Sequence, residues 1–324
     1  MKAIVQYKYG SPDNVLELKD IDKPGLKDDE VLLRVHAAAV HPGDLLIMRG
    51  LPYILRLMGF GLLRPRKRVP GFDVAGHVET VGKSVTQFQP VDEVFGVCEG
   101  ALAEYVSVSE DKLASKPANL TLEQATAVPT SGVTALLAVR DHGKVQPGQK
   151  VLINGASGGV GTFAVQIAKS FGAEVTGVCS TRNVDMVRSI GADHVIDYTR
   201  ENFTHSGQRY DSILDNVANH SLSECRRALT PKGTLIPNNG TSGGRWIGPL
   251  GRTLKALVMS PFVSQRLRPF VLMEKKEDLV VLKELIEAGE VTPVIDRTYP
   301  LREASDAIRY LEEGHARGKV VITV

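Results

Sequence analysis

A glycine-rich stretch, residues 154–161, is the part of the chain best suited to bind an anionic ligand. It reads Asn-Gly-Ala-Ser-Gly-Gly-Val-Gly and lies between an apolar run and a helix-patterned run. Gly158 and Gly161 allow backbone to approach a phosphate and a strand to approach a helix, whose N-terminal N–H groups face the anion. Alanine replaces the first glycine of the usual pattern. We predict a dinucleotide site, rather than an incidental turn, formed by Ala156, Ser157, Gly158, Gly159, Val160 and Gly161.

The residues after the next predicted strand, 174–179, indicate which dinucleotide binds. A site for NAD usually has Asp or Glu about 20 residues past the glycines, where the carboxylate accepts from the ribose hydroxyls. Ser180, Thr181 and Arg182 stand there instead. Hydroxyl and guanidinium donors suit a dianionic 2′-phosphate, so the sequence predicts NADPH as cofactor. Ser180 could alternatively act only as the N-cap of a helix that begins near Arg182.

Length and composition describe an ordinary globular protein of two domains. The chain has 324 residues, of which 43% are hydrophobic and 23% charged, and its formal net charge of +2 gives no reason to expect nucleic acid as a partner. Cys98, Cys179 and Cys225 are far apart and predict neither a disulfide framework nor a cysteine-rich metal site. We see no room for a signal peptide and no membrane-spanning run, and we expect a cytoplasmic protein.

The pattern of apolar residues changes near residue 119. Before it, short alternating strands separated by glycine and proline turns are predicted at 30–35, 73–81, 92–97 and 103–108. After it, strands alternate with helices, and the strands are predicted at 151–154, 174–179, 194–196, 212–215 and 234–237. Helices are predicted at 183–190, 221–229, 279–288 and 302–312, with a last strand at 319–324. This alternation predicts an α/β protein with a parallel, doubly wound sheet.

Several short motifs follow one another in a specific order. They are Pro70-Gly71-Phe72-Asp73-Val74-Ala75-Gly76, Gly132-Val133-Thr134-Ala135, the glycine-rich stretch, Gly191-Ala192-Asp193 and Gly318-Lys319-Val320-Val321. In this order they resemble the medium-chain dehydrogenase/reductase superfamily, specifically its zinc-free quinone oxidoreductase branch, and most closely the chloroplast-envelope quinone oxidoreductase-like enone reductases. The resemblance implies a chaperonin-10-like (GroES-like) catalytic domain of residues 1–118 and 275–324. It also implies a Rossmann domain of residues 119–274, with the active site in the cleft between the two.

Zinc-dependent alcohol dehydrogenases of this superfamily hold a catalytic zinc with a Cys, a His and a third Cys. The resemblance maps those positions onto His41, Phe72 and Thr130. One possible ligand cannot hold the ion, because an open catalytic site needs three protein ligands. Alcohol oxidation needs such a Lewis acid, so we expect reduction of an activated acceptor, either an α,β-unsaturated ketone or aldehyde or a quinone. Negative charge then develops on the acceptor's carbonyl oxygen, which pre-placed donors must stabilise.

Two residues are candidates for direct action on the substrate. His41, in His41-Pro42-Gly43-Asp44, occupies a turn that resembles the branch's Asn-Pro-x-Asp motif, and it could donate a hydrogen bond or a proton. Alternatively, His41 fixes the turn while Asp44, which is also a possible cofactor contact, caps the helix. Tyr53 lies in the next loop, and related enoyl reductases use a Tyr of the corresponding region as a possible acid. A packed loop aromatic is the alternative for Tyr53.

The remaining candidates are cofactor contacts. The resemblance places Thr130 and Thr134 beside the nicotinamide ribose and pyrophosphate, although Thr130 could instead cap its helix. The carboxyl ends of parallel strands form the ligand crevice of such folds. This rule predicts that the loops after the fourth and fifth strands frame the nicotinamide, through Asn216, Val217, Asn238, Asn239 and Gly240. Tyr198, after the third strand, could reach the adenosine phosphate or simply lie on the surface.

Two apolar stretches with interleaved arginine and lysine, 51–68 and 245–270, suggest contacts with other molecules. They could form a lid, the interface of a homodimer, the mouth of a substrate site or a peripheral membrane contact. Two further functions remain open at this point. One is an enoyl-thioester reductase, and the other is an NADPH-binding regulatory or membrane-associated protein with little turnover.

Overall fold

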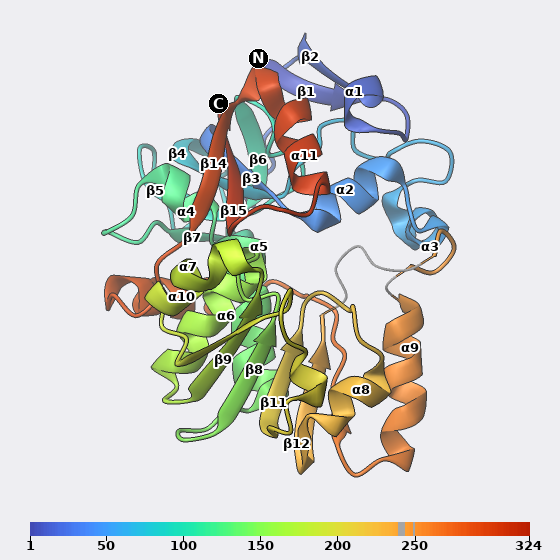
Figure 1. Cartoon of the computed structure of the whole chain (residues 1–324). Helices are drawn as coiled ribbons and strands as arrows, with labels where there is room; N and C mark the ends of the chain where they lie inside the picture. The colour runs from blue at the N-terminus through green and yellow to red at the C-terminus, as the bar shows by residue number, and fades with distance from the viewer. Residues whose placement is uncertain (239–243, 249) are drawn as a thin grey trace. The chain divides into compact units, whose positions relative to one another are not determined.

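Both ends of the chain contribute to the first of the two units into which the protein folds. The computed structural model describes residues 1–238, 244–248 and 250–324. The first unit comprises Met1–Val133, Met273–Gly289 and Pro293–Val324, and the second comprises Thr134–Leu272 and Glu290–Thr292. The first unit therefore contains both the blue and the red parts of the ribbon in Figure 1. Its first segment ends inside helix α5 (Pro129–Leu136), whereas the limit proposed from the sequence lies at residue 118.

The first unit consists mainly of β-strands. β1 (Lys2–Gln6) and β2 (Leu16–Asp20) form an antiparallel pair, and a larger sheet has the order β14-β15-β3-β4-β5-β7, with β6 also paired to β3. The strands of the larger sheet are β3 (Glu30–Val40), β4 (Asp73–Val81), β5 (Glu93–Val97), β6 (Tyr105–Ser109), β7 (Leu113–Ser115), β14 (Ile295–Pro300) and β15 (Lys319–Thr323). β15, at the carboxyl end of the chain, thus lies inside this sheet, between β14 and β3.

Strand β3 extends past the predicted limit of residue 35. Its second half contains Ala37, Ala38 and Ala39, which are fully buried. Alanine has a low strand propensity, so the sequence pattern favoured an early end. These residues nevertheless pair with β4 on one side and with β15 on the other, and this pairing outweighs the propensity.

Helices cover parts of the first unit. They are α1 (Pro12–Val15), α2 (Pro42–Arg49), α3 (Tyr53–Leu55), the π-helical turn η1 (Arg56–Phe60), α4 (Leu122–Thr126), α10 (Lys276–Glu287) and α11 (Ala304–Glu312). α11 buries Ala304, Ala307 and Ile308 in the same apolar core as Met48 of α2 and Val320 of β15. This packing fixes α2, which contains the candidate Asp44 and directly follows the candidate His41, against the sheet.

The second unit is a parallel sheet with helices between its strands, as predicted. The order is β10-β9-β8-β11-β12-β13, and every neighbouring pair is parallel. Its strands are β8 (Lys150–Asn154), β9 (Glu174–Cys179), β10 (His194–Asp197), β11 (Tyr210–Asp215), β12 (Leu229–Pro237) and β13 (Arg266–Leu267). The helices are α6 (Gly159–Ser170), α7 (Val184–Ser189), α8 (Leu222–Arg227) and α9 (Leu250–Met259), with the short turns η3 (Leu137–Gly143) and η4 (Thr181–Asn183).

The chain changes direction across this sheet between β8 and β11. From β8 it moves outward through β9 to β10, and it then returns to β11 on the other side of β8. Loops that follow two such strands diverge and leave room for a ligand at the carboxyl edge of the sheet. The glycine-rich turn and the Asn216 loop are these two loops. In the described part of the chain, no helix has both the length and the apolar composition to cross a membrane.

Candidate active site

His41 begins α2 and closes the N-terminus of that helix with its own side chain. Its Nδ1 accepts a hydrogen bond from Gly43 N at 3.0 Å, and its backbone N–H donates to Asp44 Oδ2 at 2.8 Å. A Cβ on Gly43 would lie 2.7 Å from His41 Cε1, so glycine at this position leaves space for the His41 ring. Because Nδ1 accepts, the neutral ring carries its proton on Nε2. This buried nitrogen has no hydrogen-bond partner among the described residues, which leaves a donor for a ligand.

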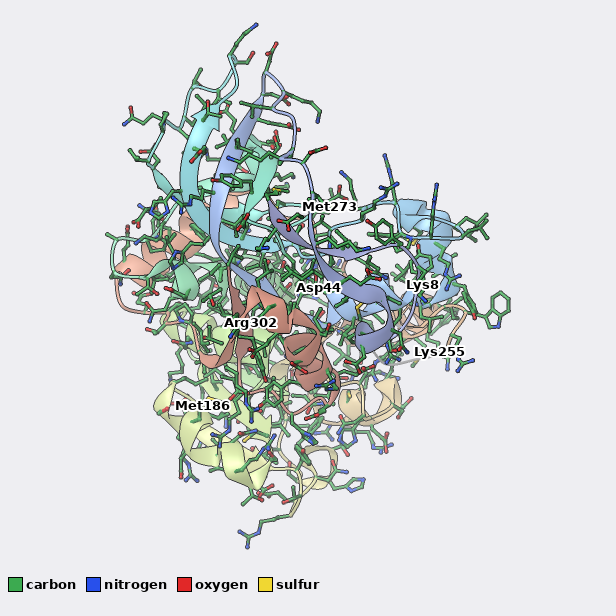
Figure 2. The ribbon with its side chains drawn as sticks, turned by 90° about the horizontal axis from the view of Figure 1, so that it is seen from above. Lys8, Asp44, Met186, Lys255, Met273 and Arg302 are labelled. Atoms are coloured by element: carbon green, nitrogen blue, oxygen red, sulfur yellow. The ribbon has the colours of Figure 1, made fainter. Side chains whose placement is uncertain are left out.

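Asp44 is packed beside that imidazole and lines a cavity. The residue is only 4% exposed, and its place on α2 is labelled in Figure 2. Its Oδ2 lies 3.5 Å from His41 Nε2, whereas its buried Oδ1 has no hydrogen-bond partner in the described structure. Burial raises the pKa of the Asp44 carboxyl above its ordinary value, and His41 opposes that rise. The cavity has a volume of about 200 Å³, and its lining includes Met48, Phe60 and Phe72 as well as Asp44.

Asp73, Thr130 and Lys319 meet where β4, α5 and β15 come together. Lys319 Nζ donates to Asp73 Oδ2 at 2.9 Å, and both side chains are almost completely buried. Asp73 Oδ1 accepts from the backbone N–H of Thr130 at 3.0 Å and from its hydroxyl at 2.5 Å. The carboxylate of Asp73 therefore caps the N-terminus of α5 and also accepts from the Thr130 hydroxyl.

The residues that the family resemblance assigns to the zinc positions, His41, Phe72 and Thr130, do not fit the ion here. The rings of His41 and Phe72 lie 5.9 Å apart, and Thr130 is bonded to the neighbouring Asp73. Phe72 offers no ligand atom, so three protein ligands cannot be assembled at these positions. Within the described ranges, no group of three or more His, Cys, Asp or Glu side chains could hold a metal ion. Zinc plays no part in the function proposed below.

The glycine-rich turn joins β8 to α6. Gly155 has a φ of +80°, which favours glycine, and a Cβ on Gly161 would lie 2.0 Å from Gly155 O. Gly158 is different, because its φ of −85° suits any residue and the nearest atom to a Cβ there would be 3.6 Å away. Nothing in the fold therefore requires glycine at this position. The missing side chain leaves room at the first turn of α6, where N–H groups have no partner within the helix, and this arrangement fits a dinucleotide phosphate.

Ser180, Thr181 and Arg182 follow β9, as predicted. The hydroxyl groups of Ser180 and Thr181 differ in their hydrogen-bond partners. Ser180 is the N-cap residue of η4, yet its side chain makes no capping hydrogen bond. Thr181 Oγ1 donates to Asp197 Oδ2 at 2.6 Å, and this bond lowers the pKa of that carboxyl. The hydroxyl proton of Thr181 is therefore already used, whereas that of Ser180 is donated to no described group. Arg182 is exposed.

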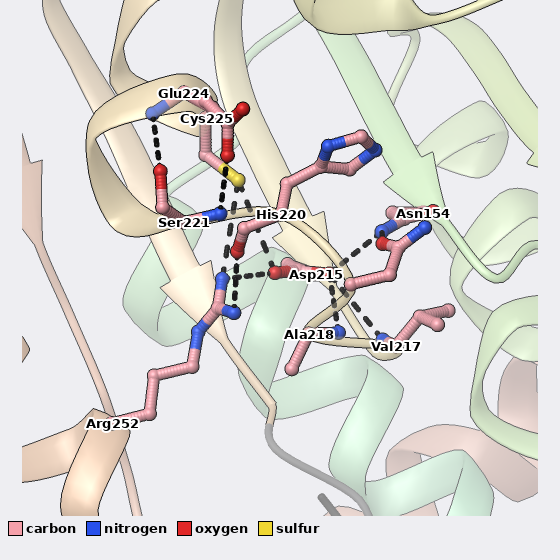
Figure 3. Close-up of polar contacts among 10 residues, drawn as sticks. Asn154, Asp215, Val217, Ala218, His220, Ser221, Glu224, Cys225 and Arg252 are labelled. Carbon is pink, nitrogen blue, oxygen red and sulfur yellow. Dashed lines mark hydrogen bonds and ion pairs between the residues drawn. The ribbon is translucent and has the colours of Figure 1, made fainter.

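Asp215 is the centre of a buried network at the end of β11, drawn in Figure 3. Its Oδ1 accepts from Asn154 Nδ2 at 2.8 Å and from Ala218 N at 3.0 Å, and its Oδ2 accepts from the guanidinium of Arg252. Ala218 has a φ of +61°, in the left-handed region that non-glycine residues rarely adopt. The bond to Asp215 thus holds a strained loop that begins at Asn216.

Asn216 and Val217, in that loop, lie beside the glycine-rich turn. A Cβ on Gly155 would be 2.7 Å from Val217 Cγ2. Asn216 Oδ1 accepts from Asn238 Nδ2 at 2.8 Å, and its buried Nδ2 has no hydrogen-bond partner in the part of the chain that the structure describes. The structure therefore brings together three of the predicted cofactor contacts, and Asn216 offers a donor to a ligand.

Removing the guanidinium of Arg252 should destabilise the second unit. We expect Arg252→Met to lower the free energy of unfolding by about 3 kcal/mol, because it leaves the fully buried Asp215 without its cation. Chemical denaturation monitored by circular dichroism measures this change. Lys255→Met is the matched control, because Lys255 lies on the same helix with its side chain exposed. Equal unfolding midpoints for the two variants would contradict the interpretation.

The other predicted residues lie in varied surroundings. Tyr53 begins α3, is partly exposed, and has the guanidinium of Arg56 4.9 Å from its ring centre. Tyr198 is 57% exposed after β10, and Thr134 is buried on α5. Asn239 and Gly240 lie outside the described residues.

The sequence reasoning does not assign roles to Asp73, Lys319, Asn183 and Arg252. Asp73 and Lys319 belong to the quoted motifs, which is a usable signal, although nothing in the sequence pairs them. Asn183 and Arg252 carry no such signal, because the bonds from Asn183 to Ser157 and from Arg252 to Asp215 form only when distant segments come together.

Comparison with known proteins places these sites in a family. Residues 27–118 match the family described as "Alcohol dehydrogenase GroES-like domain", and residues 190–322 match "Zinc-binding dehydrogenase". The chain is 33% identical to the chloroplast envelope quinone oxidoreductase homolog of Arabidopsis thaliana, over 99% of this chain and 98% of the relative. It is 35% identical to the NADPH-dependent alkenal/one oxidoreductase of the same plant, over 99% of this chain and 79% of the relative.

A solved structure agrees with this relationship. The quinone oxidoreductase from Coxiella burnetii superposes with a TM-score of 0.84 at 29% identity, covering 100% of this chain and 99% of the other. The chain therefore belongs to the quinone oxidoreductase branch of the medium-chain dehydrogenase/reductase superfamily.

Proposed function

We propose that this protein is a zinc-independent, NADPH-dependent reductase of α,β-unsaturated ketones and aldehydes or of quinones. The observation that carries the proposal is the room left at Gly158, at the first turn of a helix that follows a parallel strand. The names of the two plant relatives, a quinone oxidoreductase homolog and an NADPH-dependent alkenal/one oxidoreductase, support the reaction class. When bound, the cofactor supplies the hydride.

The second unit would hold most of the cofactor. The backbone of the turn from Ala156 to Gly161 would receive the pyrophosphate, and the side chains of Ser157, Ser180 and Arg182 would receive the 2′-phosphate. The Nδ2 of Asn216, which is buried without a partner, would donate to the nicotinamide end. Thr130 and Thr134, near the start of α5, complete the proposed contacts, and Tyr198 would lie near the adenosine phosphate.

The first unit would hold the acceptor substrate. The cavity beside α2 has mostly apolar walls, which suit the hydrocarbon part of an enone or quinone. His41 lies beside Asp44 but does not itself line this cavity. Its Nε2 is a buried donor without a hydrogen-bond partner among the described residues, and it would donate to a substrate oxygen that reaches past Asp44 and develops negative charge. Tyr53 stays a proposed proton source for the α-carbon.

The donor function of His41 can be separated from its structural function. We expect His41→Ala to lower kcat by about 100-fold, the usual loss when one such donor is removed. His41→Asn should recover most of that loss, because the amide also donates, and its oxygen can still accept from Gly43 N. Steady-state kinetics measure both variants. If Asn were as poor as Ala while the thermal stability stayed normal, His41 would act through proton transfer instead.

Reductase activity itself is tested by the oxidation of NADPH in the presence of the purified, EDTA-treated protein. A short-chain vinyl ketone and a simple quinone are offered separately. Turnover of the enone, with NADH a much poorer donor, would support the proposal in full, and turnover of the quinone alone would restrict it to quinones. Binding of NADPH without turnover of either would contradict it and favour a regulatory protein.

We also propose that residues 51–68 contact a membrane surface and that the protein is a cytoplasmic homodimer. The side chains of Leu57, Leu62 and Leu63 are 70%, 62% and 87% exposed, close to the exposed Arg64 and Arg66. Apolar side chains beside cations suit an anionic lipid surface. Co-sedimentation with anionic liposomes tests the membrane contact, and light scattering tests the dimer.

A further inference from the structure

Asn183, a buried residue at the end of η4, joins the two segments that we propose to bind the cofactor's phosphates. It is 4% exposed. Its Nδ2 donates to Ser157 Oγ, in the glycine-rich turn, at 3.1 Å and to Ser180 Oγ, after β9, at 3.2 Å. An amide nitrogen carries two hydrogens, so these two bonds use both of them. The two serine oxygens are therefore held in place by one buried nitrogen.

These bonds leave the hydrogen of each serine hydroxyl group available for donation to another acceptor. A serine hydroxyl whose oxygen accepts from an amide keeps its own hydrogen for another acceptor. In the described structure, neither Ser157 nor Ser180 donates its hydroxyl hydrogen, and both side chains are partly exposed. Thr181 provides the contrast, because its hydrogen is donated to Asp197. Two ordered donors without an acceptor are what an anion at this edge of the sheet would need.

We propose that Asn183 is the positioning residue that makes this protein prefer the 2′-phosphorylated cofactor. It orients Ser157 and Ser180 so that both hydroxyl hydrogens face the 2′-phosphate. The inference rests on the proposed function, because it concerns the same cofactor site. It goes further in assigning the selectivity to a buried residue that would not touch the phosphate.

The test measures binding of two nucleotide fragments by calorimetry, without catalysis. The probes are adenosine 2′,5′-bisphosphate and 5′-AMP, which differ only in the 2′-phosphate. We expect Asn183→Ala to reduce the preference for the bisphosphate about tenfold, which corresponds to one hydrogen bond to a charged group. Asn183→Asp should reduce it further, because a carboxylate accepts both hydroxyl hydrogens and adds negative charge. Binding of 5′-AMP should change little.

Single serine variants test the same idea without touching the buried amide. Ser157→Ala and Ser180→Ala should each reduce the preference, and adding Asn183→Ala to Ser180→Ala should cost less than it does in the wild-type protein. Ser189→Ala, on the exposed side of α7, is the control and should leave the preference unchanged. If Asn183→Ala weakened both probes equally, Asn183 would be a packing residue only. Additive effects of the Asn183 and Ser180 variants would also overturn the proposal.

Kinetics with NADPH and NADH provide a second measurement and separate this inference from the proposed function. Asn183→Ala should lower kcat/KM for NADPH while that for NADH stays within about twofold of the wild-type value. If the wild-type protein bound both fragments equally, the assignment of NADPH itself would fail. A wild-type preference that survives in every Asn183 variant would instead reject only the function of Asn183.

Discussion

Replacing Lys319 with methionine is expected to lower the free energy of unfolding by about 3–5 kcal/mol, which is a large part of the stability of a typical domain. The ammonium group is the cation that faces Asp73, and the two side chains are 2% and 0% exposed. Without it the carboxylate stays buried, and among the described residues it keeps only its bonds to Thr130. Urea denaturation of the whole chain, monitored by circular dichroism, measures this change in the free energy of unfolding.

Two further variants make this expectation specific. Lys2→Met removes a lysine from a surface ion pair with Asp20, whose side chains are 56% and 77% exposed, and should change the stability little. The double variant Asp73→Asn/Lys319→Met should be more stable than Lys319→Met, because it no longer buries an unpaired charge. If the double variant were the less stable of the two, the loss would come from packing around the lysine chain rather than from charge.

The second large effect concerns two glycines of the same turn. We expect Gly161→Ala to lose stability and Gly158→Ala to lose cofactor binding. Gly161→Ala places a methyl group 2.0 Å from Gly155 O and 2.8 Å from backbone atoms of Ala156. The backbone cannot move away without separating α6 from β8, so we expect a loss of about 3 kcal/mol in stability. Gly158→Ala meets nothing closer than 3.6 Å and should fold normally. It should nevertheless bind NADPH about 100-fold more weakly, equivalent to about 2.7 kcal/mol.

Thermal unfolding and fluorescence titration with NADPH distinguish the two variants. Gly25→Ala is a suitable control, because no atom lies within 4 Å of a Cβ there. It should change neither stability nor binding. Normal NADPH binding by Gly158→Ala would mean that the phosphates do not lie against this turn.

Several strands of both units, and the topology of the second unit, could be predicted from the sequence because several independent signals agreed. Residues 174–179 and 73–81 were predicted as strands and coincide with β9 and β4. Each is rich in β-branched residues and bounded by turn residues, so local preference and tertiary pairing favour the same structure. The alternation of strands and helices after residue 119 then implied the parallel order that the structure has.

Where local preference and tertiary pairing disagree, the sequence was less informative. The strand β12 begins at Leu229, five residues before the predicted start, because Tyr210 of β11 pairs with Leu229 across an irregular register. β13 has only two residues, too few for any periodicity to be recognised.

The candidate site also contains residues that local sequence reveals and residues whose function depends on tertiary contacts. The glycine-rich turn and His41 belong to contiguous motifs, so their neighbours along the chain reveal them. Asn183 and Arg252 act through side-chain bonds to residues 26 and 37 positions away, respectively. One sequence contains no record of such pairs, because the spacing depends on how the sheet and its loops fold. Thr181 shows the reverse case, since its hydroxyl suggested a phosphate contact and is instead donated to Asp197.

The place of β15 inside the first sheet has a consequence for biosynthesis. During translation, β3 and Asp73 leave the ribosome long before residues 319–323, which must supply the neighbouring strand and the cation. The second unit, whose last residue is Thr292, can complete its fold earlier. We therefore expect the nascent first unit to remain open, with an unpaired strand edge, until residues 319–323 have left the ribosome. During that interval it is the part of the protein most dependent on chaperones and most exposed to proteases.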